Sequence, residues 1–129
     1  MRASEIMQTG IVSVSPELSL RDFEQLLTGE DIGGAPVVDN REQIVGIATK
    51  TDVVRALGDG YGDRLAEPLD PELTVADIMT ERVVTASPDE DVRKIAQQMV
   101  DGRLHRIVVA DEERIVGLIT SFDLLRLLT

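Results

Sequence analysis

Apolar residues recur along the chain with two different periods, and these periods predict a mixed protein of helices and strands. After Pro16 and again after Pro88 they fall at helical spacing, whereas other apolar runs are only long enough for strands. The expected strands are residues 11–14, 35–38, 44–49, 83–86, 107–110 and 115–120. The predicted order is strand, helix, strand, strand, helix, twice over. The fold class is therefore α/β, with α+β character.

The expected helices carry start signals and one apolar face each. Ser19 stands three residues before Asp22, and Asp91 occupies the equivalent place in the second half, as helix caps do. The later helices begin at residues 51–52 and 122–123, and short helical turns at SEIM and VADIM precede the two halves. The apolar faces expected in the core are Leu20, Phe23, Leu26 and Leu27, and then Val92, Ile95, Ala96 and Met99.

The two halves are copies of one another. The stretch IVGIATKTD at residues 44–52 returns as IVGLITSFD at residues 115–123, a spacing of 71 residues, and earlier matches lie at a spacing of 72. Each copy keeps one glycine inside a strand, Gly46 or Gly117. A glycine in a strand permits a β-bulge or a close approach of another backbone, so we expect one of these at both positions.

The repeats define the predicted domain organisation. They cover residues 1–57 and 75–129, and a linker rich in Gly, Pro and acids joins them at residues 58–74. A repeat of this size buries only a small core, so we expect the two to pack together with pseudo-two-fold symmetry. The groove between them should then hold two related ligand sites.

A Thr-x-x-Asp sequence stands where the last helix of each copy begins. Thr49 with Asp52, and Thr120 with Asp123, bring a hydroxyl, free backbone N–H groups and a carboxylate to one helix N-terminus. A carboxylate can accept hydrogen bonds from a vicinal diol, so this set suits a ribose and its phosphate. The alternative is that Thr and Asp only cap the helix.

The charge balance excludes some classes of partner. The 129 residues carry 24 acidic and 13 basic side chains, a formal net charge of −11, so the overall field repels nucleic acid and anionic membranes. An anionic ligand needs a local group of bases, and Arg103, His105 and Arg106 supply one. Strand alternation would place Arg103 and His105 on one face and Arg106 on the other, unless the segment bends there. Alternatively, these bases pair with surface acids.

Signals for catalysis and for membrane insertion are missing from the sequence. There is no Cys, no nucleophile elbow, no phosphate loop and no His pair at metal spacing. The acids of PDED, residues 88–91, could attract a divalent cation, but acids before a helix ordinarily suit its dipole. The apolar runs are too short to cross a membrane, and the N-terminus lacks a signal-peptide pattern. We expect a cytoplasmic protein without enzymatic activity, metal or resident cofactor.

The order of these motifs resembles the cystathionine-β-synthase (CBS) domain, twice. DIMTERVVTASP, then a helix, then GRLHRIVVADEERIVGLITSFDLL carries the likeness in the second copy. SEIMQTGIVSVSP with DIGGAPVVDNREQIVGIATKTDVV carries it in the first. A tandem pair, or Bateman module, implies a regulatory protein that binds AMP, ADP or ATP in the cleft between the repeats and signals to a partner protein. It also implies a homodimer.

The resemblance implies two sites of unequal strength. In the family a Thr and an Asp contact the ribose, the first strand of the opposite repeat holds the adenine, and a His-Arg pair meets the phosphates. The main site is expected at Thr49, Lys50, Asp52, Val83, Val84, Arg103, His105 and Arg106. The second site, which has Gly33-Gly34 in place of the bases, is expected at Ile11, Val12, Gly34, Ala35, Pro36, Thr120, Ser121 and Asp123. Two alternatives stay open: an S-adenosylmethionine or NAD binder, and an interaction or dimerisation scaffold with a vestigial pocket.

Overall fold

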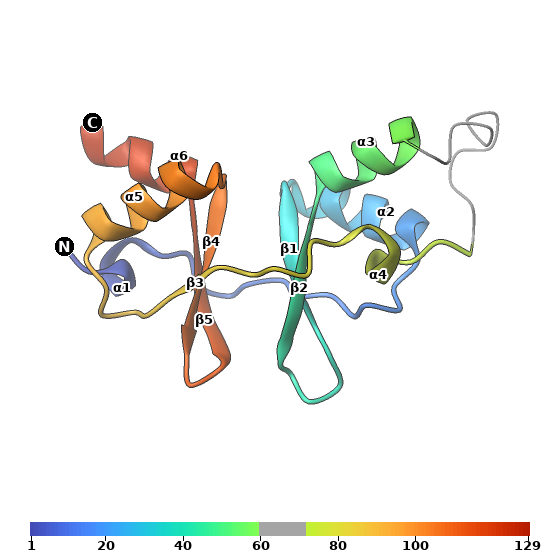
Figure 1. The fold of residues 1–129 in the computed structure, drawn as a ribbon, viewed down its shortest axis with the longest axis horizontal. Helices are drawn as coiled ribbons and strands as arrows, with labels where there is room; N and C mark the ends of the chain where they lie inside the picture. Colours follow the sequence, from blue (N-terminus) through green and yellow to red (C-terminus); the bar gives the residue numbers. More distant parts are fainter. Residues whose placement is uncertain (60–71) are drawn as a thin grey trace. The chain divides into compact units, whose positions relative to one another are not determined.

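A β-hairpin stands at the centre of each half of the chain, as the repeated strand pairs predict (Figure 1). The computed structural model describes residues 1–59 and 72–129, which form two units, so most of the predicted linker lies outside the described residues. The first-hairpin unit, within residues 12–83, contains α2 (Leu20–Glu30), β1 (Gly34–Val38), β2 (Ile44–Thr49), α3 (Lys50–Asp59) and α4 (Val75–Ile78). The second-hairpin unit, residues 1–11 and 84–129, contains α1 (Ala3–Ile6), β3 (Thr85–Ala86), α5 (Val92–Gly102), β4 (Arg106–Asp111), β5 (Arg114–Thr120), α6 (Ser121–Leu125) and the 3₁₀ helix η2 (Arg126–Leu128).

Each hairpin is irregular beside its glycine. β1 and β2 pair in antiparallel fashion with a register shift directly after Val37, which lies opposite Gly46. β4 and β5 pair in the same way, and their shift follows Val109, which lies opposite Gly117. A register shift of this kind is a bulge, and it bends the strand that carries the extra residue. The predicted bulge is therefore confirmed at both glycines.

The first predicted strand of each repeat is shorter than expected. Residues 83–86 contribute only β3, which pairs in parallel with β4, and residues 11–14 contribute a single parallel bridge between Val14 and Val37. The boundary between the two units falls inside both predicted strands, after residues 11 and 83. The first part of each is therefore connecting chain. Pro16 and Pro88, which lack an N–H group, prevent the ladder from continuing at the other end.

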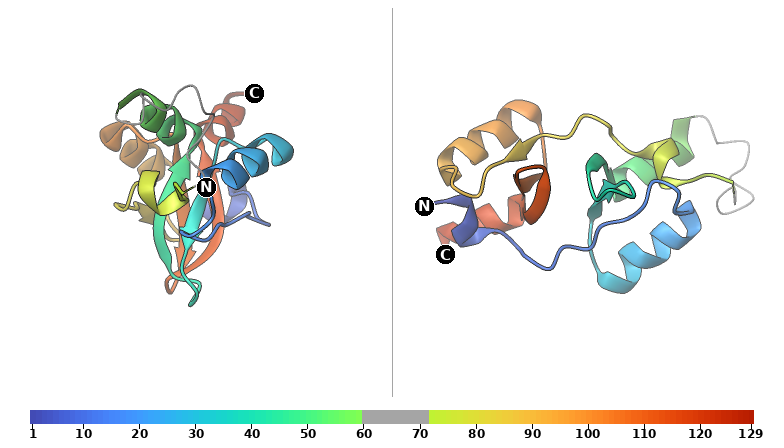
Figure 2. Two further views of the ribbon diagram at one scale, coloured as in Figure 1. Left: turned by 90° about the vertical axis from the view of Figure 1, so that its right-hand side faces the viewer. Right: turned by 90° about the horizontal axis from the view of Figure 1, so that it is seen from below.

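The short helix that opens each repeat packs on the hairpin of the other repeat. Figures 1 and 2 show α1, at the blue end of the chain, with the orange and red elements of the second-hairpin unit. The Gln8 N–H donates to the Leu118 carbonyl oxygen at 2.8 Å, and the Leu118 N–H donates back at 3.0 Å. Thr80, which follows α4, makes the same pair of bonds with Ile47 of β2. The first residues of each sequence repeat thus fold with the hairpin of the other repeat, an arrangement that we call the exchange of short segments.

This exchange explains why both hairpins need a glycine. A Cβ atom added to Gly46 would lie 3.0 Å from the carbonyl oxygen of Thr80. One added to Gly117 would lie 2.9 Å from the carbonyl oxygen of Gln8. Because a side chain would collide with the incoming backbone, only glycine permits the approach. The predicted close approach is confirmed together with the bulge.

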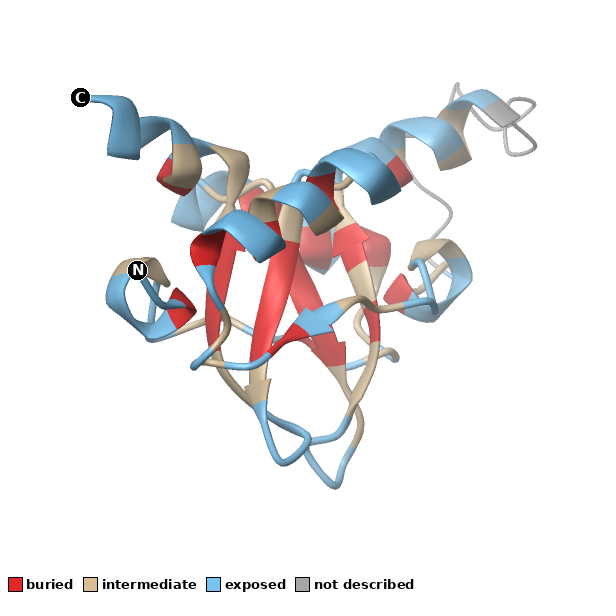
Figure 3. Cartoon of the chain, turned by 60° about the vertical axis from the view of Figure 1, so that its left-hand side comes forward, coloured by how far each residue is buried: buried red, intermediate tan, exposed pale blue. Residues whose placement is uncertain are grey.

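The long helices begin at the predicted caps and bury the predicted faces. The Ser19 hydroxyl oxygen accepts from the Asp22 N–H at 3.1 Å, and Asp91 accepts from the Arg93 N–H at 2.8 Å. The buried residues lie mostly on the strands and at single positions along the helices (Figure 3). They include Leu20, Phe23, Leu27, Val92, Ile95 and Met99, whereas Leu26 and Ala96 are half-buried. Within residues 1–59 and 72–129, no helix is long and apolar enough to cross a membrane.

Candidate functional site

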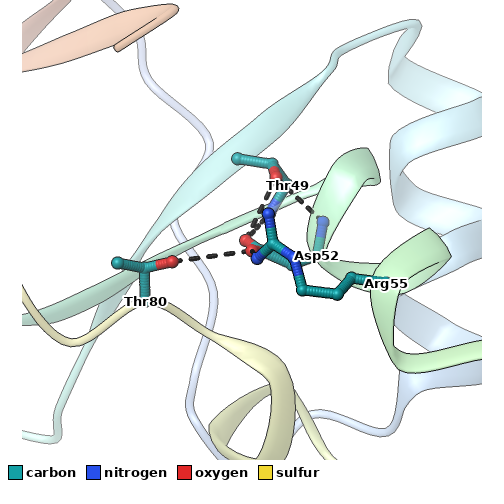
Figure 4. A network of polar contacts seen from close by, with 4 residues as sticks. All are labelled: Thr49, Asp52, Arg55 and Thr80. Atoms are coloured by element: carbon teal, nitrogen blue, oxygen red, sulfur yellow. Dashed lines mark hydrogen bonds and ion pairs between the residues drawn. The ribbon is translucent and has the colours of Figure 1, made fainter. Parts of the chain in front are cut away.

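Asp52 lies buried at the start of α3, where the residue that ends β2 holds it. Only 6% of Asp52 is exposed. Its Oδ2 accepts hydrogen bonds from the Thr49 N–H at 2.9 Å and from the Thr49 hydroxyl at 3.0 Å. Its Oδ1 accepts from Arg55 Nη1 at 3.2 Å and from the Thr80 hydroxyl at 3.5 Å (Figure 4). Thr49 therefore holds Oδ2, and Oδ1 contacts Arg55 and Thr80. We call Thr80, which comes from outside the helix of Asp52, the outer partner of this carboxylate.

Asp123 repeats this arrangement at the start of α6, with a different outer partner. Asp123 is 5% exposed, and its Oδ2 accepts from the Thr120 N–H at 2.8 Å and from the Thr120 hydroxyl at 3.1 Å. The side-chain amide of Gln8 donates to both carboxylate oxygens, at 3.0 Å and 3.1 Å. Arg126 matches Arg55 in the repeat, but its guanidinium lies over the Phe122 ring, 5.3 Å from the centroid.

A third Thr-x-x-Asp sequence separates helix capping from burial. At the start of α4, Asp77 Oδ2 accepts from the Thr74 N–H at 2.8 Å and from the Thr74 hydroxyl at 3.2 Å, but Asp77 is exposed. The threonine contacts alone are therefore an ordinary capping box, as the alternative interpretation of the sequence predicts. Asp52 and Asp123 differ from Asp77 in being buried and in meeting a polar side chain from a distant part of the chain.

The clustered bases lie where the chain passes from α5 to β4. Arg103 ends α5 in a left-handed conformation with φ 52°, and β4 begins only at Arg106. Strand alternation therefore does not apply to the three bases, because the left-handed residue Arg103 bends the chain before the strand starts, which is the alternative left open by the sequence. The His105 carbonyl oxygen accepts from the N–H of Ser121 at 2.9 Å and from its hydroxyl at 3.2 Å. These bonds tie the basic segment to the start of α6.

The residues expected to form the two sites are divided between the units. In the first-hairpin unit lie Val12, Gly34, Ala35, Pro36, Thr49, Lys50, Asp52 and Val83. In the second-hairpin unit lie Ile11, Val84, Arg103, His105, Arg106, Thr120, Ser121 and Asp123. The structure brings together each Thr with its Asp, and His105 with Ser121. The grouping of all sixteen residues into a main and a second site stays a prediction.

Three partners of the buried carboxylates were not predicted from the sequence. Arg55 lies three residues after Asp52, so the general pairing of helix neighbours could have indicated it. Gln8 and Thr80 gave no such local signal, because each reaches a carboxylate far away in the sequence. Across the described part of the chain, no group of three or more His, Asp or Glu side chains is placed to hold a metal ion.

Comparison with known proteins identifies the repeat. The family model of the CBS domain matches residues 3–59 and 75–129. The chain belongs to the CBS domain family. The resemblance seen in the sequence and the α/β fold of two CBS repeats are both confirmed. The fold is shared with the CBS-domain containing protein ATU1752 from Agrobacterium tumefaciens, with a TM-score of 0.88 and 21% identity over the full length of both chains.

The relatives of this CBS pair include longer proteins and a solved complex. The uncharacterized protein MJ1225 of Methanocaldococcus jannaschii is 31% identical over 96% of this chain and 41% of its own length. Inosine-5'-monophosphate dehydrogenase of the same organism is 32% identical over 97% of this chain, which spans only 23% of that enzyme. The solved CBS domain pair of protein MJ0100 is 28% identical, with a TM-score of 0.83 over all of both chains. The chain thus spans less than half the length of the two curated relatives.

Proposed function

We propose that this CBS pair is a non-enzymatic regulatory module that binds an adenosine-containing ligand, foremost AMP, ADP or ATP, and signals to a partner protein. The observation that carries the proposal is the pair of buried carboxylates, Asp52 and Asp123. A carboxylate only accepts hydrogen bonds, so it suits the two neighbouring hydroxyls of a ribose. Hydrogen bonds with a charged acceptor are stronger than neutral ones, and low exposure strengthens them further. A helix cap needs no such burial, as Asp77 shows.

A related structure supports adenosine as the chemical class of the ligand. The CBS domain pair of protein MJ0100 was solved in complex with 5'-methylthioadenosine and S-adenosyl-L-methionine. Both molecules contain an adenosine whose ribose carries neighbouring hydroxyls. The same two hydroxyls are present in AMP, ADP and ATP, so the shared feature that the carboxylates would recognise is the ribose and not the group attached to it.

The stronger of the two sites is proposed at Asp52. By likeness to the family, Lys50 and the bases Arg103, His105 and Arg106 would meet the phosphates of its ligand. Arginine suits this role because its guanidinium binds phosphate through two parallel hydrogen bonds. The site at Asp123 is assigned no such bases. We therefore expect it to hold an uncharged adenosine group weakly or to stay empty.

A thermal-shift experiment tests the proposal on the whole chain. The probes are AMP, ADP, ATP, 5'-methylthioadenosine, S-adenosylmethionine and NAD. A ligand at about a hundred times its Kd adds about 2.7 kcal/mol to the stability, which is readily measured. At least one probe should raise the Tm of the wild type. The shift should vanish in Asp52→Asn and persist in Asp123→Asn and in the capping control Asp77→Asn.

The same experiment separates the roles of ribose and phosphate. Arg103→Ala should weaken the shift with AMP or ATP and leave the shift with 5'-methylthioadenosine unchanged, because that compound carries no phosphate. A shift that survives in Asp52→Asn and Asp123→Asn alike would remove the carboxylates from the binding role. If no probe raises the Tm, the ligand-binding function is refuted and the scaffold function takes its place.

A scaffold or dimerisation function has one observation in its favour. Apolar side chains at the C-terminal end of the second-hairpin unit are exposed, with Phe122 at 66%, Leu125 at 58% and Leu128 at 85%. Exposed apolar side chains that lie near one another are typical of interaction surfaces. They favour the homodimer that the family resemblance implies. Sedimentation of the wild type and of Leu128→Asp tests it, since loss of a dimer in the variant would locate the contact.

A further inference from the structure

The outer partners of the two buried carboxylates come from the same place in the repeat. Gln8 and Thr80 each follow an Ile-Met pair, and they lie 72 residues apart. Both are fixed by two backbone hydrogen bonds to a hairpin, Gln8 to Leu118 at 2.8 and 3.0 Å and Thr80 to Ile47 at 2.8 and 2.9 Å. Each side chain is therefore presented to its carboxylate by an ordered backbone. The two carboxylates therefore differ in the side chain presented to them, which is Gln8 at Asp123 and Thr80 at Asp52.

Gln8 satisfies its carboxylate more completely than Thr80 does. The Gln8 amide nitrogen lies 3.0 and 3.1 Å from the two oxygens of Asp123, whereas the Thr80 hydroxyl lies 3.5 Å from one oxygen of Asp52. An amide N–H only donates, as a ribose hydroxyl must when it meets a carboxylate, so the two compete for the same lone pairs. A threonine hydroxyl both donates and accepts, so Thr80 can turn and accept a bond from a ligand hydroxyl.

The remaining partner of Asp52 is easily displaced. The Arg55 side chain is 60% exposed, and an ion pair with such an exposed group contributes little free energy. At Asp123, the equivalent arginine, Arg126, lies over the Phe122 ring. Gln8, which is not part of α6, contacts both carboxylate oxygens of Asp123. A ribose that approaches Asp52 therefore replaces weak contacts. One that approaches Asp123 has to displace the amide of Gln8, a residue that is also exposed but contacts both carboxylate oxygens.

We propose that Gln8 is a selectivity residue that prevents Asp123 from accepting a ribose, so that Asp52 alone does so with useful affinity. This inference rests on the proposed function and adds Gln8, beside the missing bases, as a second reason why the two sites are unequal. Gln8→Thr, which introduces the residue found at position 80, should allow Asp123 to bind a ribose. Since a hydrogen bond to a charged group is at stake, the expected gain in affinity is about tenfold or more.

Calorimetric titration with AMP tests the proposal in a chain that lacks the first site. The comparison is between Asp52→Asn and the double variant Asp52→Asn/Gln8→Thr. AMP should bind the double variant at least about tenfold more tightly. 2'-Deoxy-AMP, which lacks one of the two hydroxyls, should show no such gain. Adding Asp123→Asn should abolish the gain, which assigns it to that carboxylate.

The reciprocal exchange provides the matched control. Thr80→Gln in the otherwise wild-type chain should weaken AMP binding by about tenfold, because the amide would then cover Asp52. Threonine is tolerated at this place in the repeat, as Thr80 shows, and Gln8→Ala serves the same purpose if Gln8→Thr does not fold. An unchanged AMP affinity in the double variant overturns the proposal. Absence of AMP binding by the wild type would refute the function proposed for Asp52 instead, and the gain at Asp123 would still be measured separately.

Discussion

Gly117 is the position where the exchange of short segments can be tested most directly. A Cβ atom added there would lie 2.5 Å from Met7 Sδ and 2.9 Å from the Gln8 carbonyl oxygen. The thioether can swing aside, but the carbonyl oxygen is held by the Leu118 N–H at 3.0 Å. Either β5 or the segment that follows α1 therefore has to shift in Gly117→Ala. Overpacking of this kind costs about 1–3 kcal/mol. In a chain of this length that lowers the Tm by roughly 4 °C for each kcal/mol.

Gly29→Ala is the matched control for this prediction. Gly29 lies within α2, and an added Cβ would meet nothing within 4 Å. Alanine has the higher helix propensity and reduces the entropy of the unfolded chain, so this variant should gain about 0.5–1 kcal/mol. Thermal denaturation followed by circular dichroism should therefore give shifts of opposite sign. A Gly117→Ala protein that melts at or above the wild-type temperature would refute the reasoning.

Three further predictions concern a helix cap, an ion pair and the packing of the first eight residues. Ser19→Ala removes the cap on the Asp22 N–H and should cost about 1 kcal/mol in urea denaturation; an unchanged midpoint would show that water replaces the cap. Arg55→Ala should change stability by less than about 0.5 kcal/mol in the same assay, and a larger loss would show that its ion pair with Asp52 is structural. Deletion of residues 1–8 should increase amide hydrogen exchange in β5 and leave β2 unchanged; equal effects on both strands would contradict the exchanged packing.

The elements that could be predicted from the sequence are those with a local cause. Ser19 caps α2 because its hydroxyl reaches an N–H three residues ahead, and this spacing is visible in the sequence. The hairpins follow from paired apolar runs joined by short polar turns, and their bulges follow from Gly46 and Gly117. The glycines also indicate that another backbone approaches. They do not indicate which one, because nothing local connects Gly117 with Gln8.

The candidate site divides in the same way. Thr49 and Asp52 stand three residues apart on one helix start, so their hydrogen bonds could be predicted as a cap or as part of a ribose site. Burial distinguishes Asp52 from the exposed capping residue Asp77, and burial depends on chain segments brought together by folding. The contrast with Asp77, which has the same spacing and the same threonine bonds but is exposed, shows that the motif alone cannot carry the function.

The exchange of short segments gives the proposed ligand a direct connection to the rest of the chain. Thr80 bonds to Asp52 through its side chain and to Ile47 through its backbone, and the chain leaves the first-hairpin unit three residues later. Gln8 likewise bonds to Asp123 through its side chain and to Leu118 through its backbone, and the chain leaves the second-hairpin unit after residue 11. A ribose bound at Asp52, as proposed, would therefore act on a residue beside the connection between the units. Under the proposed regulatory function, binding at Asp52 would in this way bias the connecting chain.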